Sequence, residues 1–140
     1  MQAEVFLDTA YAIALTIKSD TFHERAIRLA DLLTRQKTRL ITTRPILLEI
    51  GNALSKLRYR HVAISLLRSL ELDPLVEIVP LSETLYRRAF TLYCDRADKT
   101  WGLIDCMSFV VMQDRGITEA LTTDEHFQQA GFRVLLREDI

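Results

Sequence analysis

Short apolar stretches alternate with longer amphipathic stretches along most of this chain. The apolar stretches cover residues 5–7, 39–42, 76–79, 119–122 and 132–136, and each has the length of a strand. The segments between them place apolar residues three and four apart, as Phe22, Ala26 and Leu29 do, which predicts helices. This alternation predicts an α/β fold with a mostly parallel central sheet of about four to five strands, flanked by helices on both faces.

Local signals mark where several helices begin and end. Thr43 can cap a helix that carries Pro45 in its first turn, and Ser82 can cap a later one that runs through Tyr93. Gly116 and Gly131 are suited to ending helices. The expected helices cover residues 10–17, 21–33, 43–57, about 60–72, 82–93, 103–115 and about 124–130.

Size and charge limit the class of protein. The chain has 140 residues, which predicts one domain over 1–140. A net charge of −1 and a hydrophobic fraction of 49% are typical of a globular protein, and they argue against a disordered tail or a strongly basic nucleic-acid binder. The N-terminal residues lack a signal-peptide pattern, and no apolar run approaches the length of a membrane span, so we expect a cytoplasmic protein with no membrane partner.

The cysteines and histidines are scattered. Cys94 and Cys106 form no CxxC pair, which favours reduced thiols over a disulfide framework or a zinc site. His23, His61 and His126 are equally isolated, so packing or surface roles are expected for them rather than metal ligation.

Four carboxylates lie at junctions between predicted elements. Asp8 and Asp124 follow predicted strands, while Glu49 and Asp105 lie early in predicted helices. Functional groups in open α/β sheets gather beyond the carboxyl ends of the strands. Each residue also has a simpler interpretation, because Asp8 and Asp124 can cap helices and Glu49, at the margin of an apolar helix face, can point to solvent.

Asp105 gives the strongest local argument. It is the one carboxylate in the almost wholly apolar segment 103–112, which predicts a helix buried on most sides. An unpartnered carboxylate there would incur a desolvation cost of several kcal/mol, more than the roughly 0.3–1 kcal/mol that a helix N-terminus offers. A cation, an ion pair with Arg44 or Arg96, or exposure of the first helical turn would each compensate for this cost.

Convergence of the four carboxylates would imply a metal ion. Carboxylates that share one site repel each other unless a multivalent cation neutralises them. Oxygen ligands select a hard ion such as Mg²⁺ or Mn²⁺, and the lack of a His or Cys cluster disfavours Zn²⁺. Such ions also bind phosphate oxygens, so chemistry at a phosphate bond is the expected use.

At these residues the chain resembles the PIN-domain nucleases, particularly the VapC-type toxin ribonucleases and their free-standing relatives. The resemblance covers nearly the whole chain and rests on four blocks in order, at residues 5–9, 49–54, 101–109 and 122–127. It implies that Asp8, Glu49 and Asp105 form a metal-binding catalytic core, with Asp124 as a fourth and more variable member. Thr9 and Ser108 would be hydroxyls near the cluster, with local helix-end bonding as their alternative role.

The resemblance also implies a function and partners. We expect an endoribonuclease in which Mg²⁺ or Mn²⁺ activates a water that attacks phosphorus and displaces the ribose 3′ oxygen, leaving a 5′ phosphate. Single-stranded or looped RNA is the expected substrate, an antitoxin protein is a possible partner, and relatives commonly form homodimers. A PIN-like binding module without activity, a purely structural role for the carboxylates and a metal-dependent phosphatase stay open as alternatives.

Several other residues have two interpretations. Trp101 is expected to pack rather than to stack on bases, and the apolar residues Ile64, Leu67 and Leu70 are expected to be core rather than a dimer surface. Basic residues could form a positive rim for RNA, although such residues usually just face solvent. The candidates are Lys18, Arg44, Arg58, Arg60, Arg96, Lys99 and Arg115.

Overall fold

The computed structural model describes residues 2–138. The strands are β1 (Glu4–Leu7), β2 (Arg39–Thr43), β3 (Val76–Val79), β4 (Glu119–Leu121) and β5 (Arg133–Val134). The helices are α1 (Thr9–Thr16), α2 (His23–Gln36), α3 (Arg44–Ala53), α4 (Leu57–Leu72), α5 (Glu83–Asp95), α6 (Leu103–Arg115), α7 (Glu125–Gln129) and the 3-10 turn η1 (Leu135–Arg137). Within 2–138 no helix is both long enough and apolar enough to cross a bilayer.

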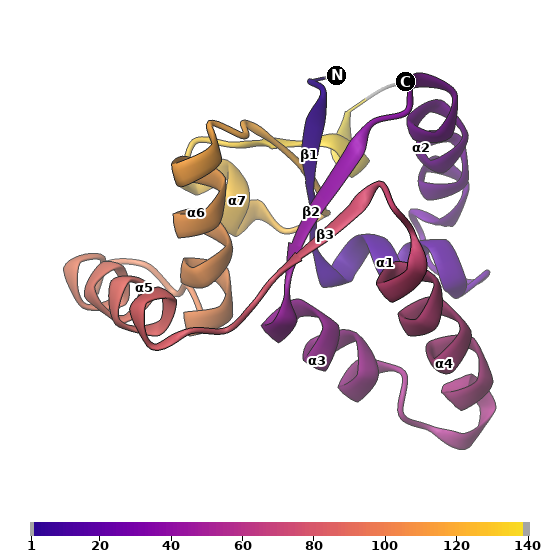
Figure 1. Cartoon of the computed structure of the whole chain (residues 1–140), viewed down its shortest axis with the longest axis horizontal. Helices are drawn as coiled ribbons and strands as arrows, with labels where there is room; N and C mark the ends of the chain where they lie inside the picture. Colours follow the sequence, from indigo (N-terminus) through magenta and orange to yellow (C-terminus); the bar gives the residue numbers. More distant parts are fainter. Residues whose placement is uncertain (1, 139–140) are drawn as a thin grey trace.

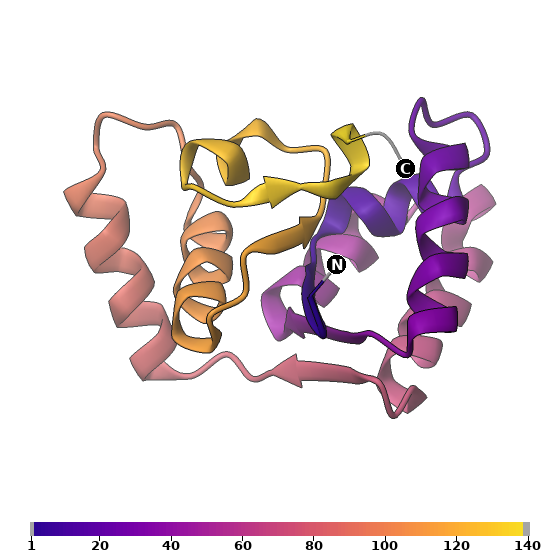
Figure 2. The same cartoon turned by 90° about the horizontal axis from the view of Figure 1, so that it is seen from above.

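The five strands form one sheet in the order β3-β2-β1-β4-β5, and every neighbouring pair is parallel. The chain builds outward from β1 to β3 and then returns to the other side of β1 to add β4 and β5. Because crossover connections are right-handed, this reversal puts the first group of helices on one face and the later group on the other. Figure 2 shows α1, α2 and α4 on one side of the sheet and α5, α6 and α7 on the opposite side, as labelled in Figure 1. The predicted α/β sheet with helices on both faces is confirmed.

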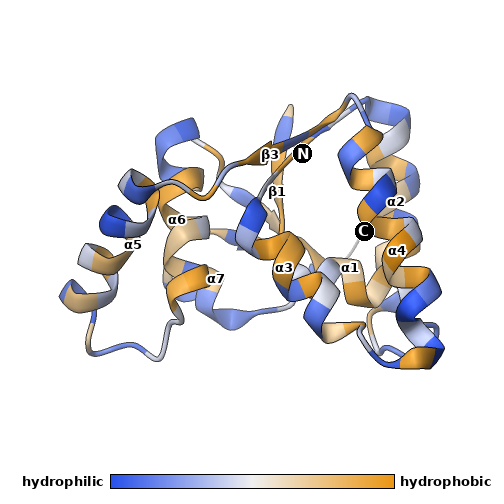
Figure 3. Ribbon diagram, turned by 60° about the horizontal axis from the view of Figure 1, so that its bottom comes forward, coloured by the Kyte–Doolittle hydropathy of each residue, from blue (hydrophilic) through white to orange (hydrophobic). Residues whose placement is uncertain are grey.

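The core lies between the sheet and these helices. Phe6 of β1 and Ile41 of β2 are fully buried, as expected of central parallel strands covered on both faces. On the later face, Phe109 of α6 packs edge-on against Phe127 of α7, with ring centroids 5.0 Å apart. Figure 3 shows the resulting division, with hydrophobic residues along the strands and α3 and hydrophilic turns on the outer side of α5.

The predicted capping signals at Thr43, Ser82 and Gly116 are confirmed, while the C-cap of α7 is Ala130, one residue before Gly131. The Thr43 hydroxyl accepts the N–H of Ile46 at the start of α3, and the Ser82 hydroxyl accepts the N–H of Leu85 at the start of α5. Gly116 ends α6 with a φ of 66°, a left-handed conformation that glycine adopts without strain.

Two element boundaries differ from the prediction. The last strand was expected over 132–136, but it covers only Arg133–Val134 and the chain then turns into η1. Its neighbour β4 has three residues, and this edge strand has no second neighbour among residues 2–138 to extend the ladder. The boundary between α3 and α4 also differs, because the helix after Thr43 was expected to extend to Leu57 but ends at Ala53. Helix α4 begins at Leu57, which is 92% exposed, rather than near Arg60.

The prediction that the apolar residues of α4 are core is confirmed for Leu67 and Leu70 but not for Ile64. Leu70 is buried and Leu67 packs against the core, while Ile64 is 39% exposed.

Candidate active site

The strand order reverses between β1 and β4, and the segments that follow these two strands diverge. In open α/β sheets such a reversal leaves a crevice beyond the carboxyl ends of the strands. Asp8 follows β1 directly, and Asp124 comes shortly after the end of β4. Residues near opposite ends of the sequence therefore lie at the same edge of the sheet.

Asp8 is the most buried member of the site, with 6% of its surface exposed. Its Oδ2 accepts a 2.7 Å hydrogen bond from the hydroxyl of Thr122, and its main-chain N–H donates to the Leu121 carbonyl. Asp8 occupies the N-cap position of α1, but its side chain makes no capping bond to that helix. The carboxylate is therefore held by the residue that follows β4 rather than by the helix it precedes.

Glu49 reaches the crevice from the middle of α3. Its Oε1 accepts a 2.9 Å hydrogen bond from the hydroxyl of Thr9, in the first turn of α1. The side chain is half-buried and points to the cleft, which settles the choice between cleft and solvent. Thr9 thus orients a carboxylate, as the resemblance implied.

Asp105 enters the crevice from the opposite face of the sheet, in the first turn of α6. Its Oδ2 accepts the N–H of Gly102 at 3.1 Å, so it also fulfils a capping role. Neither arginine considered for it is its partner, because Arg44 pairs with Glu71 and Arg96 with Asp98. Besides the Gly102 N–H, the partner of Asp105 is His126, whose Nδ1 lies 3.1 Å from the same Oδ2.

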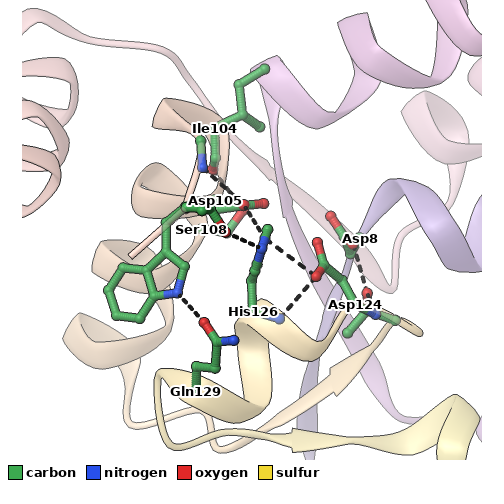
Figure 4. A network of polar contacts seen from close by, with 11 residues as sticks. Asp8, Ile104, Asp105, Ser108, Asp124, His126 and Gln129 are labelled. Carbon is green, nitrogen blue, oxygen red and sulfur yellow. Dashed lines mark hydrogen bonds and ion pairs between the residues drawn. The ribbon is translucent and has the colours of Figure 1, made fainter. Parts of the chain in front are cut away.

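His126 links two of the carboxylates and was not expected at the site. Its Nδ1 also lies 3.3 Å from Oδ1 of Asp124, and its Nε2 contacts the hydroxyl of Thr100 at 3.2 Å. Figure 4 shows the imidazole between Asp105 and Asp124, with Asp8 close by. Asp124 also caps α7, since its Oδ1 accepts the N–H of His126 at 2.9 Å. The sequence predicted a packing or surface role for His126 and did not place it beside the carboxylates. The signal that could have done so is its position two residues after a capping aspartate.

Two further candidates have structural roles. The Ser108 hydroxyl donates to the Ile104 carbonyl one turn earlier, which is the local bonding considered as its alternative. Trp101 is buried, packs edge-on against Phe109 with centroids 5.0 Å apart and donates from Nε1 to Gln129. Trp101 is therefore a packing residue, as predicted.

These side chains line one open cleft of about 620 Å³. All four predicted carboxylates contribute to it, together with Thr9 and a residue not predicted, Arg137 of η1. The described residues that line the cleft include none of the seven basic residues considered as an RNA rim. Five of these seven form ion pairs or hydrogen bonds elsewhere: Arg44, Arg60, Arg96, Lys99 and Arg115.

The cleft carries more negative charge than its partners balance. Burial is the main cause that raises the pKa of Asp8 to about 7, partly offset by the Thr122 hydroxyl, and the charges of Asp105 and Glu49 raise it further. Burial also raises the pKa values of Glu49 and Asp105, and the charge of Asp124 adds to both shifts. A bound cation would offset the repulsion between these carboxylates.

The donor set suits a hard divalent cation. Asp105, Asp124 and His126 each offer one ligand atom, and these atoms lie within 4.8 Å of one another, with Asp8 and Glu49 on the same cleft. Carboxylate oxygens dominate this set, which fits Mg²⁺ or Mn²⁺. The nearby imidazole nitrogen is tolerated better by Mn²⁺ than by Mg²⁺, a preference that the scattered histidines did not suggest.

The fold and the site together define the class of protein: an α/β protein with an acidic cleft, in which four carboxylates lie where the strand order of the sheet reverses. The sequence model of the PIN domain matches residues 5–133, and the chain belongs to this family. The resemblance seen in the sequence is therefore confirmed.

Two known proteins are similar to this chain over nearly its whole length. VapC20 of Mycobacterium tuberculosis, named as a 23S rRNA-specific endonuclease, is 27% identical over 128 residues, or 91% of this chain and 95% of VapC20. The crystal structure of M. tuberculosis VapC20, described as a toxin that cleaves the sarcin-ricin loop, superimposes with a TM-score of 0.80 at 25% identity over 91% of this chain and 95% of that one. FitAcB from Neisseria gonorrhoeae has a TM-score of 0.64 at 19% identity over 93% of this chain and 95% of that one, which supports the fold.

Proposed function

We propose that this protein is a Mg²⁺- or Mn²⁺-dependent endoribonuclease of the toxin type. The observation that carries the proposal is the convergence of Asp8, Glu49, Asp105 and Asp124 on one cleft of a PIN domain. The likeness to VapC20 over nearly the full length of both chains supports RNA as the substrate.

The four carboxylates would hold the cation directly or through water. When bound, Mg²⁺ or Mn²⁺ supplies a water of lowered pKa and stabilises negative charge on the departing oxygen. A water attacks the phosphorus of the scissile phosphodiester, the bond to the ribose 3′ oxygen breaks, and the downstream fragment keeps a 5′ phosphate. Thr122 and Thr9 orient the carboxylates of Asp8 and Glu49 through hydrogen bonds of 2.7 and 2.9 Å.

His126 would position the other two carboxylates. Its Nδ1 lies within hydrogen-bond distance of Asp105, and its main-chain N–H fixes Asp124. Partners that orient ligand carboxylates usually matter for metal affinity, because a carboxylate free to rotate loses the geometry that the ion requires.

The substrate proposed is RNA with an unpaired loop. An unpaired strand exposes its backbone, so a single phosphate can enter the cleft without clashing with a complementary strand. VapC20 is named as a 23S rRNA-specific endonuclease that cleaves the sarcin-ricin loop, so ribosomal RNA is the first class of substrate to test. Action on ribosomal RNA would place the activity in the cytoplasm.

The partners proposed are an antitoxin and a second copy of the chain. VapC20 is described as a toxin, and a toxin requires an inhibitor in the cell that makes it. Exposed apolar side chains on α3 and α4, such as Leu48, Val62 and Ile64, offer surface for association. Size-exclusion chromatography with light scattering tests the dimer, and a mass near 16.2 kDa would contradict it.

The function is tested by incubating purified protein with a mixed pool of structured RNA in Mg²⁺ or Mn²⁺. EDTA and the variant Asp105→Asn run alongside, and Asp114→Asn is the matched control because Asp114 lies on the same helix but pairs with Arg88 at the surface. We expect cleavage by wild type and Asp114→Asn, with loss on the order of 100-fold or more in EDTA and in Asp105→Asn. Fragments should carry 5′ phosphates and become substrates for a 5′-phosphate-dependent exonuclease.

A folded and fully active Asp105→Asn protein would refute the assignment of the site. RNA binding without cleavage in either metal would instead favour the alternative of a binding module.

A further inference from the structure

A groove leads out of the acidic cleft along α1. A second hollow, of about 260 Å³, shares Ala10, Ile13 and Thr123 with the cleft and continues to Asp20, Thr21 and Phe22. Because three residues line both hollows, the two form one continuous surface depression. Its floor next to the carboxylates is apolar, and its far end carries an aromatic ring.

Arg137 lies at the junction of the two hollows. Its Nε donates a 2.5 Å hydrogen bond to the carbonyl of Thr123, which fixes the guanidinium at the rim. Among the described residues that line the cleft, Arg137 is the one cationic side chain. Since this bond uses Nε and the guanidinium fork carries further N–H donors on its two Nη groups, the side chain is suited to a phosphate oxygen.

Phe22 is a half-buried ring at the end of the groove, and two guanidinium groups lie over it. The Arg137 guanidinium lies 5.8 Å and that of Arg25 6.0 Å from the ring centroid. Arg137 belongs to η1, and Phe22 to the segment that joins α1 to α2, so their contact brings these two parts of the chain together. Two segments distant in sequence therefore build this end of the groove.

The loop that carries Phe22 is held firmly. Oδ1 of Asp20 accepts the N–H of Phe22 at 2.8 Å, and Nδ1 of His23 lies 2.7 Å from the carbonyl of Ala14 on α1. These bonds hold the loop, and Phe22 is itself half-buried, so its side chain loses less entropy than a fully exposed one when a planar group stacks on it.

We propose that this groove holds the unpaired nucleotide next to the scissile phosphate, with the neighbouring phosphate on Arg137 and the base against Phe22 and Ile13. This inference rests on the proposed ribonuclease function. A nucleotide fits because the groove combines the Arg137 guanidinium, an apolar floor and the Phe22 ring. The Asp20 carboxylate also lines the groove, and its Oδ1 accepts the N–H of Phe22. Any strand that places a phosphate in the cleft must leave it through adjoining surface.

The test measures binding of a fluorescent single-stranded RNA by anisotropy, in the full chain carrying Asp105→Asn so that the RNA stays intact. In this background Arg137→Gln and Phe22→Leu should each weaken binding on the order of tenfold. Phe22→Leu keeps an apolar side chain against the core, and Phe22→Tyr should bind as the parent does because it retains the ring. Phe90→Ala and Arg87→Gln, on the exposed side of α5, are matched controls and should also bind as the parent does.

A series of RNAs with single abasic sites tests whether Phe22 contacts a base. Abasic sites are placed one position at a time, and at one position the abasic RNA should bind equally well to the Asp105→Asn parent and to its Phe22→Leu derivative. Thermal melting accompanies each variant, so that a folding defect is recognised as such.

The outcomes separate this inference from the proposed function. Unchanged RNA affinity in both Arg137→Gln and Phe22→Leu overturns the groove, even if wild type cleaves RNA, and leaves the two residues as a clamp between η1 and α2. If those variants instead lose binding to the antitoxin while RNA affinity is unchanged, the groove is a protein site and the inference also fails. If wild type does not cleave but the tenfold losses appear, the nuclease proposal fails and the groove stands as an RNA-binding site.

Discussion

Asp8 shows, at the scale of single residues, how a functional group can oppose folding. Its side chain is almost wholly removed from solvent, and its pKa rises to about 7 mainly for that reason. Near neutral pH without a cation, the folded protein must either ionise a buried carboxyl or retain a proton that the unfolded chain releases. The same burial prepares the carboxylate to bind a cation strongly.

This conflict predicts a pH-dependent gain in stability for Asp8→Asn. Between pH 4 and 7 the folded state binds more protons at Asp8 than the unfolded state, so the free energy of unfolding of wild type falls as pH rises through this range. The substitution Asp8→Asn removes this pH dependence of stability, because the amide does not titrate. In EDTA, Asp8→Asn should melt above wild type at pH 8, and the two curves should converge near pH 4.

Asp114→Asn is the contrasting control. Arg88 lowers the pKa of Asp114, so this variant should show no gain at pH 8. Equal melting of Asp8→Asn and wild type at pH 8 would contradict the burial argument.

His126 is expected to support metal binding by holding Asp105 in place. The variant His126→Gln removes the contact that holds Asp105, so metal affinity and cleavage rate should each fall about 10- to 100-fold. Mn²⁺ titration monitored by thermal shift gives the affinity without requiring activity. The control His61→Gln, on the exposed surface of α4, should leave metal affinity and cleavage rate unchanged. Wild-type affinity and rate in His126→Gln would show that His126 does not support the site.

At the scale of elements, helix starts position the site. Helix α3 carries Glu49 and begins at the buried cap Thr43, and α6 begins at the turn that presents Asp105. A cap fixes both the first turn and the direction of a helix, so a side chain one or two turns later depends on it.

Removing the two confirmed caps should separate stability from function. Thr43→Ala and Ser82→Ala should each lower the free energy of unfolding by about 1 kcal/mol, measured by urea denaturation. Thr43→Ala should also reduce cleavage, because it loosens the helix that holds Glu49. Ser82→Ala removes the cap of the distant α5, and a comparable loss of activity in this variant would contradict the positional argument.

For the whole molecule, the cleft exists because the strand order reverses between β1 and β4. Asp8 and Glu49 arrive with one set of crossovers and Asp105 and Asp124 with the other. A ligand in the cleft therefore joins both halves of the fold, and binding that favours the folded state stabilises the entire protein.

Metal should accordingly raise the melting temperature. At a concentration of about 100 times Kd, Mn²⁺ or Mg²⁺ should add about 2.7 kcal/mol to the stability of wild type, and EDTA should reverse this gain. The gain should grow as pH rises towards 8, since protons and metal compete for Asp8. A comparable gain in Asp105→Asn would place the metal elsewhere.

The sequence alone determined the features that depend on short-range physical chemistry. Apolar periods located the strands and helices, Thr43, Ser82 and Gly116 marked their ends, and an isolated carboxylate in an apolar helix singled out Asp105. Each of these signals acts within a few residues, so no neighbour distant in the chain was needed to interpret them.

Tertiary structure decided what these residues meet. The partner of Asp105 is His126 rather than Arg44 or Arg96. The cation at the cleft is Arg137, from a turn that overlaps the segment predicted as strand. These pairings follow from the position of β4 beside β1 and of η1 beside α2. That arrangement results from the burial of apolar faces over the whole molecule, and no local pattern around either residue records it.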